Sequence, residues 1–330
     1  MSASSPQPAP ELNHPQSRDS VLTVRNALLL AIPTDLALRW REASPILVFA
    51  VALVSIYPLA EMMAEATEAL AAKLRPTLGG LNASLNNVPE IIIALFALKN
   101  GLGEVVKSSI TGSILIELLF GLGLAMLLGG LKHGPQTFNR EAIQINAGLL
   151  TLCAFALIIP ALFHLSSPAA EKELSWEIAA ILFFLVYVAN LGRTLFRKQE
   201  MPAGTVEHAV PTKVSAEPKG KAAGVLLVAT LLLAVMSVVV TDALEPASKQ
   251  LGLTAVFSGI ILLAGAGGIG EISSSTRFAR SDQMDVCISA TVGSSIQMIL
   301  LSVPILVFAA RSWAPTWACA SISSKSRPWS

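Results

Sequence analysis

The sequence predicts an all-α, polytopic membrane protein built from inverted-topology helical repeats. Hydrophobic residues make up 53% of the 330 residues and charged residues 14%, and the mean hydropathy is +0.64. An ordinary soluble domain carries roughly 25% charged residues. Apolar runs near or above the roughly 20 residues that cross a bilayer recur along the chain. Two of these runs contain an acidic residue in closely similar surroundings, which predicts the repeat.

The apolar runs predict about nine membrane crossings. The first run is weak, because Pro33 and Asp35 interrupt it. The runs cover residues 21–38, 44–72, 80–98, 103–130, 142–164, 174–196, 223–246, 252–276 and 284–310. Residues 1–20 are polar and rich in Pro and Ser, with no basic cluster before an apolar core. They are typical of a disordered tail and not of a cleaved signal.

One substantial linker, residues 197–222, divides the chain. It has no apolar stretch long enough to cross, and with its flank it is the most basic connection, containing Arg193, Arg197, Lys198, Lys213, Lys219 and Lys221. The positive-inside rule places such a loop in the cytoplasm. Because six crossings precede it, we expect the amino terminus there too.

Several function classes are excluded by what the chain contains. The net charge of +1 comes without a basic face, so no nucleic-acid partner is expected. The cysteines Cys153, Cys287 and Cys319 stand alone, without metal-ligand spacing. No nucleophile with a base and no His-Glu-x-x-His motif occurs, so we expect neither an enzyme nor a bound cofactor.

Residues 265–271, GAGGIGE, contain the spacing Gly-x-Gly-x-x-Gly of dinucleotide-binding turns. That turn requires a preceding strand in a soluble parallel sheet. Here the glycines lie inside the membrane run FSGIILLAGAGGIGEISSS. The resemblance to a dinucleotide site is therefore accidental.

A better interpretation comes from comparing Glu271 with Glu90, which lies far upstream in LNASLNNVPEIIIALFAL. The two neighbourhoods agree in register at Ile91/Ile272, Lys99/Arg280, Glu104/Asp285, Val105/Val286, Ser108/Ser289, Gly112/Gly293 and Ser113/Ser294. These matches around a buried acid indicate an internal repeat. Five crossings separate the two copies, so the second copy is inverted in the bilayer. Many secondary transporters have this construction, with the site at the midplane between copies.

The residues just before each acid predict a weakened helix. Gly265, Gly267, Gly268 and Gly270 precede Glu271, and Asn86, Asn87 and Pro89 precede Glu90. We expect them to free backbone carbonyls for an ion, which is tolerated at membrane depth only beside protein or a cavity. The alternative is that the glycines let helices pack closely.

Glu90 and Glu271 are the candidate cation and proton ligands, because a carboxylate at mid-bilayer is costly and needs a partner. Two carboxylates that meet repel one another unless they are protonated or bridged by a metal, so a proton and a cation compete there. Hard cations such as calcium take about six to eight oxygens. The further oxygen-bearing candidates are Asn87, Ser113, Ser294 and Gln297. As alternatives, the acids could be structural, the serines could bond to their own helices, and the two amides could join helices.

Two further acids are candidates for a proton path. Glu117 lies one turn into the helix GSILIE and could equally be a ligand. Glu61, Glu65 and Glu68 recur at helical spacing in EMMAEATEAL, a pattern typical of a solvated face or vestibule, and Glu68 is the candidate with a direct role.

The chain resembles the calcium/cation:proton antiporters of the cation/calcium exchanger superfamily over about residues 44–310. The resemblance rests on ATEALAAKL, GGLNASLNNVPEIIIALFALKNGL, VVKSSITGSIL, LGLAMLLGGLKHGPQTFN and GSSIQMILLSVPILV. The family motif Gly-Asn-x-x-Glu is matched by Asn87 and Glu90. In the second copy Glu271 matches but Gly268 stands in the Asn position, and Glu117 stands where an Asn is common.

The resemblance implies an extra helix plus a first five-helix repeat over residues 21–196 and a partial second repeat over 223–310. After PILVFAAR the family continues through two more helices, whereas residues 311–330 form an atypical polar tail, so a truncated chain is expected. The implied activity is exchange of calcium or a similar cation for protons in a lipid bilayer, which we expect to be the bacterial inner membrane. The alternative is a non-transporting relative whose acids are structural.

Overall fold

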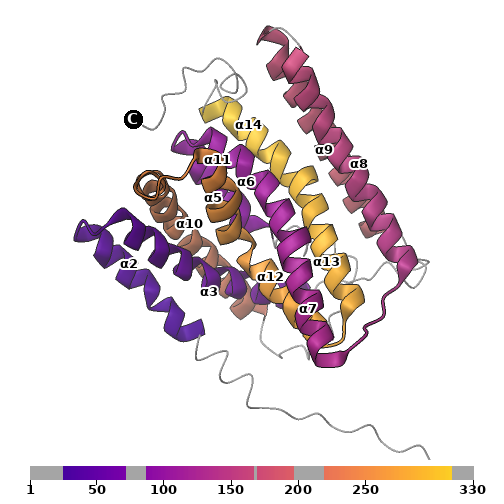
Figure 1. The fold of residues 1–330 in the computed structure, drawn as a ribbon, viewed down its shortest axis with the longest axis horizontal. Coiled ribbons are helices and arrows are strands. Elements are labelled where there is room, and N and C mark those ends of the chain that lie inside the picture. Colours follow the sequence, from indigo (N-terminus) through magenta and orange to yellow (C-terminus); the bar gives the residue numbers. More distant parts are fainter. Residues whose placement is uncertain (1–24, 72–86, 167–168, 197–218, 314–330) are drawn as a thin grey trace, which may run out of the picture.

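The computed structural model describes residues 25–71, 87–166, 169–196 and 219–313, and the regular structure in these ranges is helical (Figure 1). Each predicted apolar run coincides with a helix wherever the chain is described. The predicted tail 1–20, residues 197–218 of the linker and residues 314–330 lie outside the described residues. The expectations for those segments therefore stay predictions.

The first half of the chain contains a short leading helix, the helices of the first unit and a long hairpin. In order these are α2 (Ala31–Trp40), α3 (Pro45–Ala71), α5 (Val88–Lys99), α6 (Gly103–Leu115), η2 (Ile116–Gly121), α7 (Leu122–His133), α8 (Arg140–Ser166) and α9 (Ala169–Phe196). Helix α5 begins directly after Asn87 and carries Pro89 in its first turn, where a missing N–H costs nothing. It ends before Gly101, whose φ of 80° favours glycine.

The second half contains α10 (Lys219–Gln250), α11 (Ala255–Phe257), η3 (Ser258–Leu263), α12 (Ala264–Arg280), α13 (Met284–Gln297), η4 (Met298–Ser302) and α14 (Val303–Trp313). Thr254 caps α11, because its hydroxyl accepts a hydrogen bond from the Phe257 backbone N–H at 3.2 Å. Through η3 this helix continues into α12, so residues 255–280 form one long helical element.

The two units repeat one another in three dimensions. The continuous helix α6–η2–α7 corresponds to α13–η4–α14 in the register that aligns Glu90 with Glu271, and both contain a π-helical segment at the equivalent place. Such segments are rare and are often found at functional sites. Figure 1 shows α6–α7 and α13–α14 running in opposite directions. The predicted inverted arrangement is confirmed.

The core lies between α3, α10 and α5, where Ile56, Leu59, Ile93 and Leu233 are fully buried. Helices α8 and α9 lie along one side of the bundle (Figure 1). They expose large apolar side chains, among them Phe155, Ile159, Leu162, Leu182 and Leu185. An exposed apolar face of this extent is suited to lipid.

Five helices among the described residues are long and apolar enough to cross a bilayer: Pro45–Thr67, Gly103–His133, Gly220–Gln250, Ala255–Arg280 and Met284–Trp313. Shorter apolar stretches, Ile143–Ile159 and Glu177–Gly192, lie within α8 and α9. The chain is a polytopic, all-α integral membrane protein, as predicted.

Candidate cation and proton site

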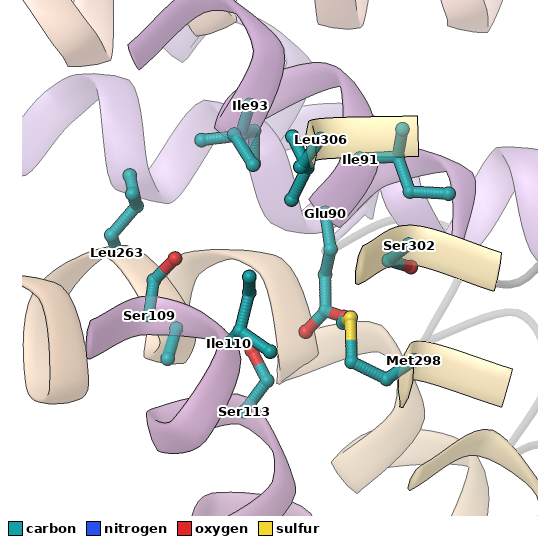
Figure 2. Close-up of a pocket in the computed structure, with 12 residues that line it drawn as sticks. Glu90, Ile91, Ile93, Ser109, Ile110, Ser113, Leu263, Met298, Ser302 and Leu306 are labelled. Carbon is teal, nitrogen blue, oxygen red and sulfur yellow. The ribbon is translucent and has the colours of Figure 1, made fainter. Parts of the chain in front are cut away.

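Glu90 lies in the first turn of α5 and lines a small internal cavity of about 20 Å³. A cavity of that size holds about one water molecule. Figure 2 shows the carboxyl between Ser113 of α6 and Met298 of η4. Neither buried carboxyl oxygen makes a hydrogen bond of normal geometry among the described residues, although the Ser113 side chain lies beside them. An acid held in this way is available to a proton or to a cation.

Glu271 lies in α12 and is linked to the first repeat through Ser294. The Ser294 Oγ lies 2.5 Å from Glu271 Oε1 and 2.7 Å from Asn87 Oδ1. Asn87 Nδ2 in turn donates to the Ser294 carbonyl oxygen at 3.3 Å. Because the hydroxyl has one proton and two acceptors, it serves one of them at a time. Asn87, Ser294 and Glu271 therefore form one polar cluster that crosses between the repeats.

The two predicted acids approach one another. Glu90 and Glu271 are close enough to interact electrostatically. Glu90 leans against the backbone of α12, because a Cβ placed on Gly267 would overlap the Glu90 Cγ, and one on Gly268 would lie 3.5 Å from Glu90 Oε1. The structure thus brings together side chains from opposite halves of the sequence.

The expectation that the glycines weaken the second helix and free its backbone carbonyls for an ion is not what the structure shows. Helix α12 runs from Ala264 to Arg280 without interruption through Gly265, Gly267, Gly268 and Gly270. Gly267 and Gly270 instead permit close approach, to Glu90 and to Ala60 of α3 respectively. The alternative interpretation, close helix packing, is the one the structure supports. In the first copy α5 does begin just before its acid, at Val88, and Asn86 lies outside the described residues.

Glu117 joins the Glu271 side of the cluster. It lies in η2 and is 2% exposed. Its Oε2 accepts a hydrogen bond from Ser295 Oγ at 2.7 Å, and its carboxyl lies within hydrogen-bonding reach of Glu271. Two carboxyls in contact repel unless a proton or a cation lies between them. Glu117 is thus a third acid of the candidate site.

The remaining predicted residues differ in how close they lie to the two acids. Ser113 is buried beside Glu90 and lines its cavity. Gln297 is the last residue of α13, and its buried Oε1 has no hydrogen-bond partner among the described residues. Glu68 lies on α3, but its side chain is outside the described part of the chain. Glu61 is not on a solvated face as expected, because its side chain is 3% exposed.

Sequence reasoning did not find Ser295 or the partner of Glu61. Ser295 follows Ser294 in the segment GSS, so its hydroxyl was visible but its direction was not. Glu61 Oε1 accepts a hydrogen bond from Arg277 Nη1 at 2.5 Å, across 216 residues of sequence. A contact at that separation has no local sequence signal.

Within the described residues, no three His, Cys, Asp or Glu side chains converge as a preformed metal cage. The oxygens near Glu271 come from a mixed set of carboxyl, hydroxyl and amide groups, which are the ligand types of hard cations.

A bundle of inverted helical repeats, joined at its centre by contacts of buried acids with serine and amide side chains of both repeats, is the construction of secondary transporters, and not of enzymes. The chain belongs to the sodium/calcium exchanger protein family, whose model matches residues 44–196 and 221–324. The resemblance to cation:proton antiporters is confirmed by curated relatives.

Those relatives match most of the chain. The Ca(2+)/H(+) antiporter of Aphanothece halophytica is 37% identical over 303 residues, which cover 87% of this chain and 81% of that protein. The Ca(2+)/H(+) antiporter ChaA of Bacillus subtilis is 36% identical over 278 residues, covering 82% of this chain and 77% of the relative.

Solved structures show the same architecture. The structure of native YfkE superposes with a TM-score of 0.74 at 30% identity, covering 88% of this chain and 83% of that one. The H+/Ca2+ exchanger CAX has a TM-score of 0.69 at 15% identity, covering 90% of this chain and 75% of that one, and shows the shared fold.

Proposed function

We propose that this chain is a secondary active transporter that exchanges calcium, or a similar hard cation, for protons by alternating access. The observation that carries the proposal is the packing of Glu90 against Gly267 and Gly268 of the helix that carries Glu271, together with the Asn87–Ser294–Glu271 cluster that joins the inverted repeats. Neither acid has a Lys or Arg partner among the described ion pairs. Protons and cations are then the charges that can neutralise them. Relatives named Ca(2+)/H(+) antiporters support the same cargo.

The proposed site is asymmetric between its two acids. Glu271 lies with Glu117, Ser294, Ser295 and Asn87 in one polar cluster. The cavity of Glu90 is lined mainly by apolar side chains, including Ile91, Ile93, Ile110, Leu263 and Leu306 (Figure 2). We assign the cation to the Glu271 side, where oxygen ligands are concentrated. Glu90 closes the site from the apolar side.

Asn87 and Ser294 have a positioning role in this scheme as well as a binding one. Asn87 Nδ2 donates to the backbone carbonyl oxygen of Ser294, and Asn87 Oδ1 competes with Glu271 for the proton of the Ser294 hydroxyl. When a cation takes the place of the hydrogen bond between Ser294 and Glu271, the hydroxyl keeps its proton, turns it to Asn87 Oδ1 and offers a lone pair to the ion. The cluster thereby exchanges a hydrogen bond for a metal ligand without moving its backbone.

The proposed location is a bacterial inner membrane, with the amino terminus and the 197–222 linker in the cytoplasm. The basic residues of this linker and its flank, Arg193, Arg197, Lys198, Lys213, Lys219 and Lys221, support this orientation. Basic residues are enriched in cytoplasmic connections.

The test is a flux assay in sealed vesicles that contain the purified protein. Calcium entry should be coupled to proton release, and Glu90→Gln and Glu271→Gln should each abolish both, because each removes one charge of the shared site. Glu104→Gln is the matched control, since Glu104 is exposed on α6 and pairs with Lys107 at 3.4 Å. A correctly folded wild type that binds calcium but carries none would favour the non-transporting alternative.

A further inference from the structure

An ion pair joins the two repeats beside the candidate site. Arg277, in the last turn of α12, donates from Nη1 to Glu61 of α3 at 2.5 Å and from Nη2 to Ser274 Oγ at 2.9 Å. The Glu61 side chain is 3% exposed, whereas that of Arg277 is 48% exposed. The pair thus has one end inside the protein and the other at its surface.

The ion pair lies close to Glu271. Ala60, next to Glu61, is the α3 residue that a Cβ on Gly270 would approach at 3.4 Å, and Gly270 directly precedes Glu271. Arg277 therefore extends back along α12 toward the site, past Ser274. Its guanidinium lies between the level of the acid and the end of the bundle. A cation that entered from this end would meet a positive charge before it reached Glu271.

A second contact of the same kind occurs at the other end of the bundle. Asp242 of α10 accepts a hydrogen bond from Asn100 Nδ2 at 2.8 Å and from Arg39 Nη2 at 2.6 Å. Asn100 also donates to Thr241 Oγ1 at 3.1 Å. Asn100 follows the last residue of α5, the helix that carries Glu90.

These contacts are related by the internal repeat. The register that aligns Glu90 with Glu271 also aligns Glu61 with Asp242. Each lies on the long central helix of one repeat and is held from the carboxyl-terminal end of the acid-bearing helix of the other repeat. We name them the Glu61 latch (Glu61 and Arg277) and the Asp242 latch (Asp242, Asn100 and Arg39).

The latches face opposite sides of the membrane. Helix α5 leads from its acid toward the start of α6, and α12 leads from its acid toward the start of α13. Figure 1 shows the starts of α6 and α13 at opposite ends of the bundle. At each of these ends the helix that carries the acid packs against a long helix of the other repeat, α12 against α3 and α5 against α10.

We propose that the two latches are the gates of the transport path, one at each membrane face. Arg277 and Glu61 hold shut the gate at the face where α13 begins, which we call the α13 side. The proposal rests on the transport function proposed above. Opening that gate separates Arg277 from Glu61 while the Asp242 latch stays closed, and the opposite opening does the reverse. Inverted repeats make the two events structurally equivalent.

The gates differ in strength because their chemistry differs. The Glu61 latch is a charge-assisted pair whose acceptor is buried, so water screens it less than a pair with both ends exposed, although the Arg277 side chain is 48% exposed. In the Asp242 latch the side chains of Arg39 and Asp242 are 46% and 38% exposed, and the third partner is a neutral amide. An exposed ion pair contributes little. The chain should therefore favour the form that is closed at the Glu61 latch.

The experiment measures access to the site by thiol labelling in reconstituted vesicles. The parent carries Ser294→Cys as the reporter, with the native cysteines replaced (Cys153→Ala, Cys287→Ala and Cys319→Ala). A membrane-impermeant maleimide is added on one side at a time. Arg277→Gln should raise the labelling rate from the α13 side about tenfold, because the closed form loses its latch. Asn100→Ala should raise it only from the opposite side.

Exchanging the charges of Arg277 and Glu61 tests whether faster labelling comes from loss of the ion pair or only from removal of a side chain that covers the site. The double variant Arg277→Glu with Glu61→Arg restores the pair with similar bulk, and its labelling rate should return to within about twofold of the parent. Arg277→Lys should lie between. An unchanged rate in Arg277→Gln, or a double variant that labels as fast as Arg277→Glu alone, would overturn the proposal. Labelling needs no transported ion, so these results are separate from a failure of calcium/proton exchange.

Discussion

The two halves of the candidate site share a backbone and differ in chemistry. The π-helical segments η2 and η4 occupy equivalent places in the two repeats. Yet Glu117 of η2 lies against Glu271, whereas its equivalent, Met298 of η4, lies beside Glu90. Asn87 in the first copy likewise corresponds to Gly268 in the second. Inverted repeats therefore fix where side chains stand, while individual substitutions decide what each half can bind.

The largest effect should come from disturbing the contact between the halves. Gly267→Ala adds a Cβ that overlaps the Glu90 Cγ, so Glu90 must shift from its position against α12. We expect calcium/proton exchange to fall by about 100-fold or more, since misplacement of a reacting group by about 1 Å has effects of that size. Flux in vesicles is the measurement.

Gly265→Ala is the matched control for that substitution. It lies on the same helix, and a Cβ there has no neighbour within 4 Å. It should leave transport unchanged and gain slightly in helix stability. Equal losses in both variants would mean that helix flexibility, and not the Glu90 contact, is what Gly267 provides.

The next effect tests the asymmetric charge. Glu117→Gln removes the third carboxyl from the Glu271 side and keeps its shape, so calcium affinity should fall about tenfold while monovalent cations compete better. Calcium titration by calorimetry, with and without sodium, measures both. Adding Met298→Glu to Glu117→Gln restores the number of carboxyls but moves the third one from the Glu271 side to the Glu90 side. If the original selectivity came back, the position of the third acid would not matter and the comparison would fail.

A smaller effect is expected from Asn87→Ala. Ser294 loses Asn87 as a hydrogen-bond partner, but its hydroxyl can still donate to Glu271 Oε1, which lies 2.5 Å away. We expect the KM for calcium to rise a few-fold, with little change in the maximal rate, because one buried hydrogen bond contributes about 1 kcal/mol. A loss of transport as complete as that of Glu271→Gln would show that Asn87 is an indispensable ligand.

The smallest effect should separate surface pairing from the interface between repeats. Arg311 pairs with Glu177 at 2.5 Å, but its side chain is 69% exposed, so Arg311→Gln should lower the free energy of unfolding by at most about 1 kcal/mol. Arg277→Gln leaves the buried Glu61 carboxylate without its charged partner and should lower the free energy of unfolding by more than Arg311→Gln does. The loss should be smaller than for breaking a fully buried ion pair, because Arg277 is half exposed. Thermal unfolding in detergent compares the two variants. Equal shifts would contradict the buried character of the Glu61 pair.

The sequence alone determined the helices, the repeat and the paired acids. Apolar length and composition decide whether a segment crosses a bilayer, and these are local properties, so the predicted runs coincide with helices. The register between the surroundings of Glu90 and Glu271 is also visible without a structure, as are the hydroxyls of Ser113 and Ser294.

Only the tertiary structure decided how these residues are used. It showed that α12 passes unbroken through its glycines, that Glu117 rather than Met298 faces Glu271, and that Arg277 is held by Glu61. Each of these facts depends on which helices pack together and at what distance. Side-chain packing between segments far apart in the chain leaves no periodic signal in the sequence, because either partner alone satisfies the same local helical pattern.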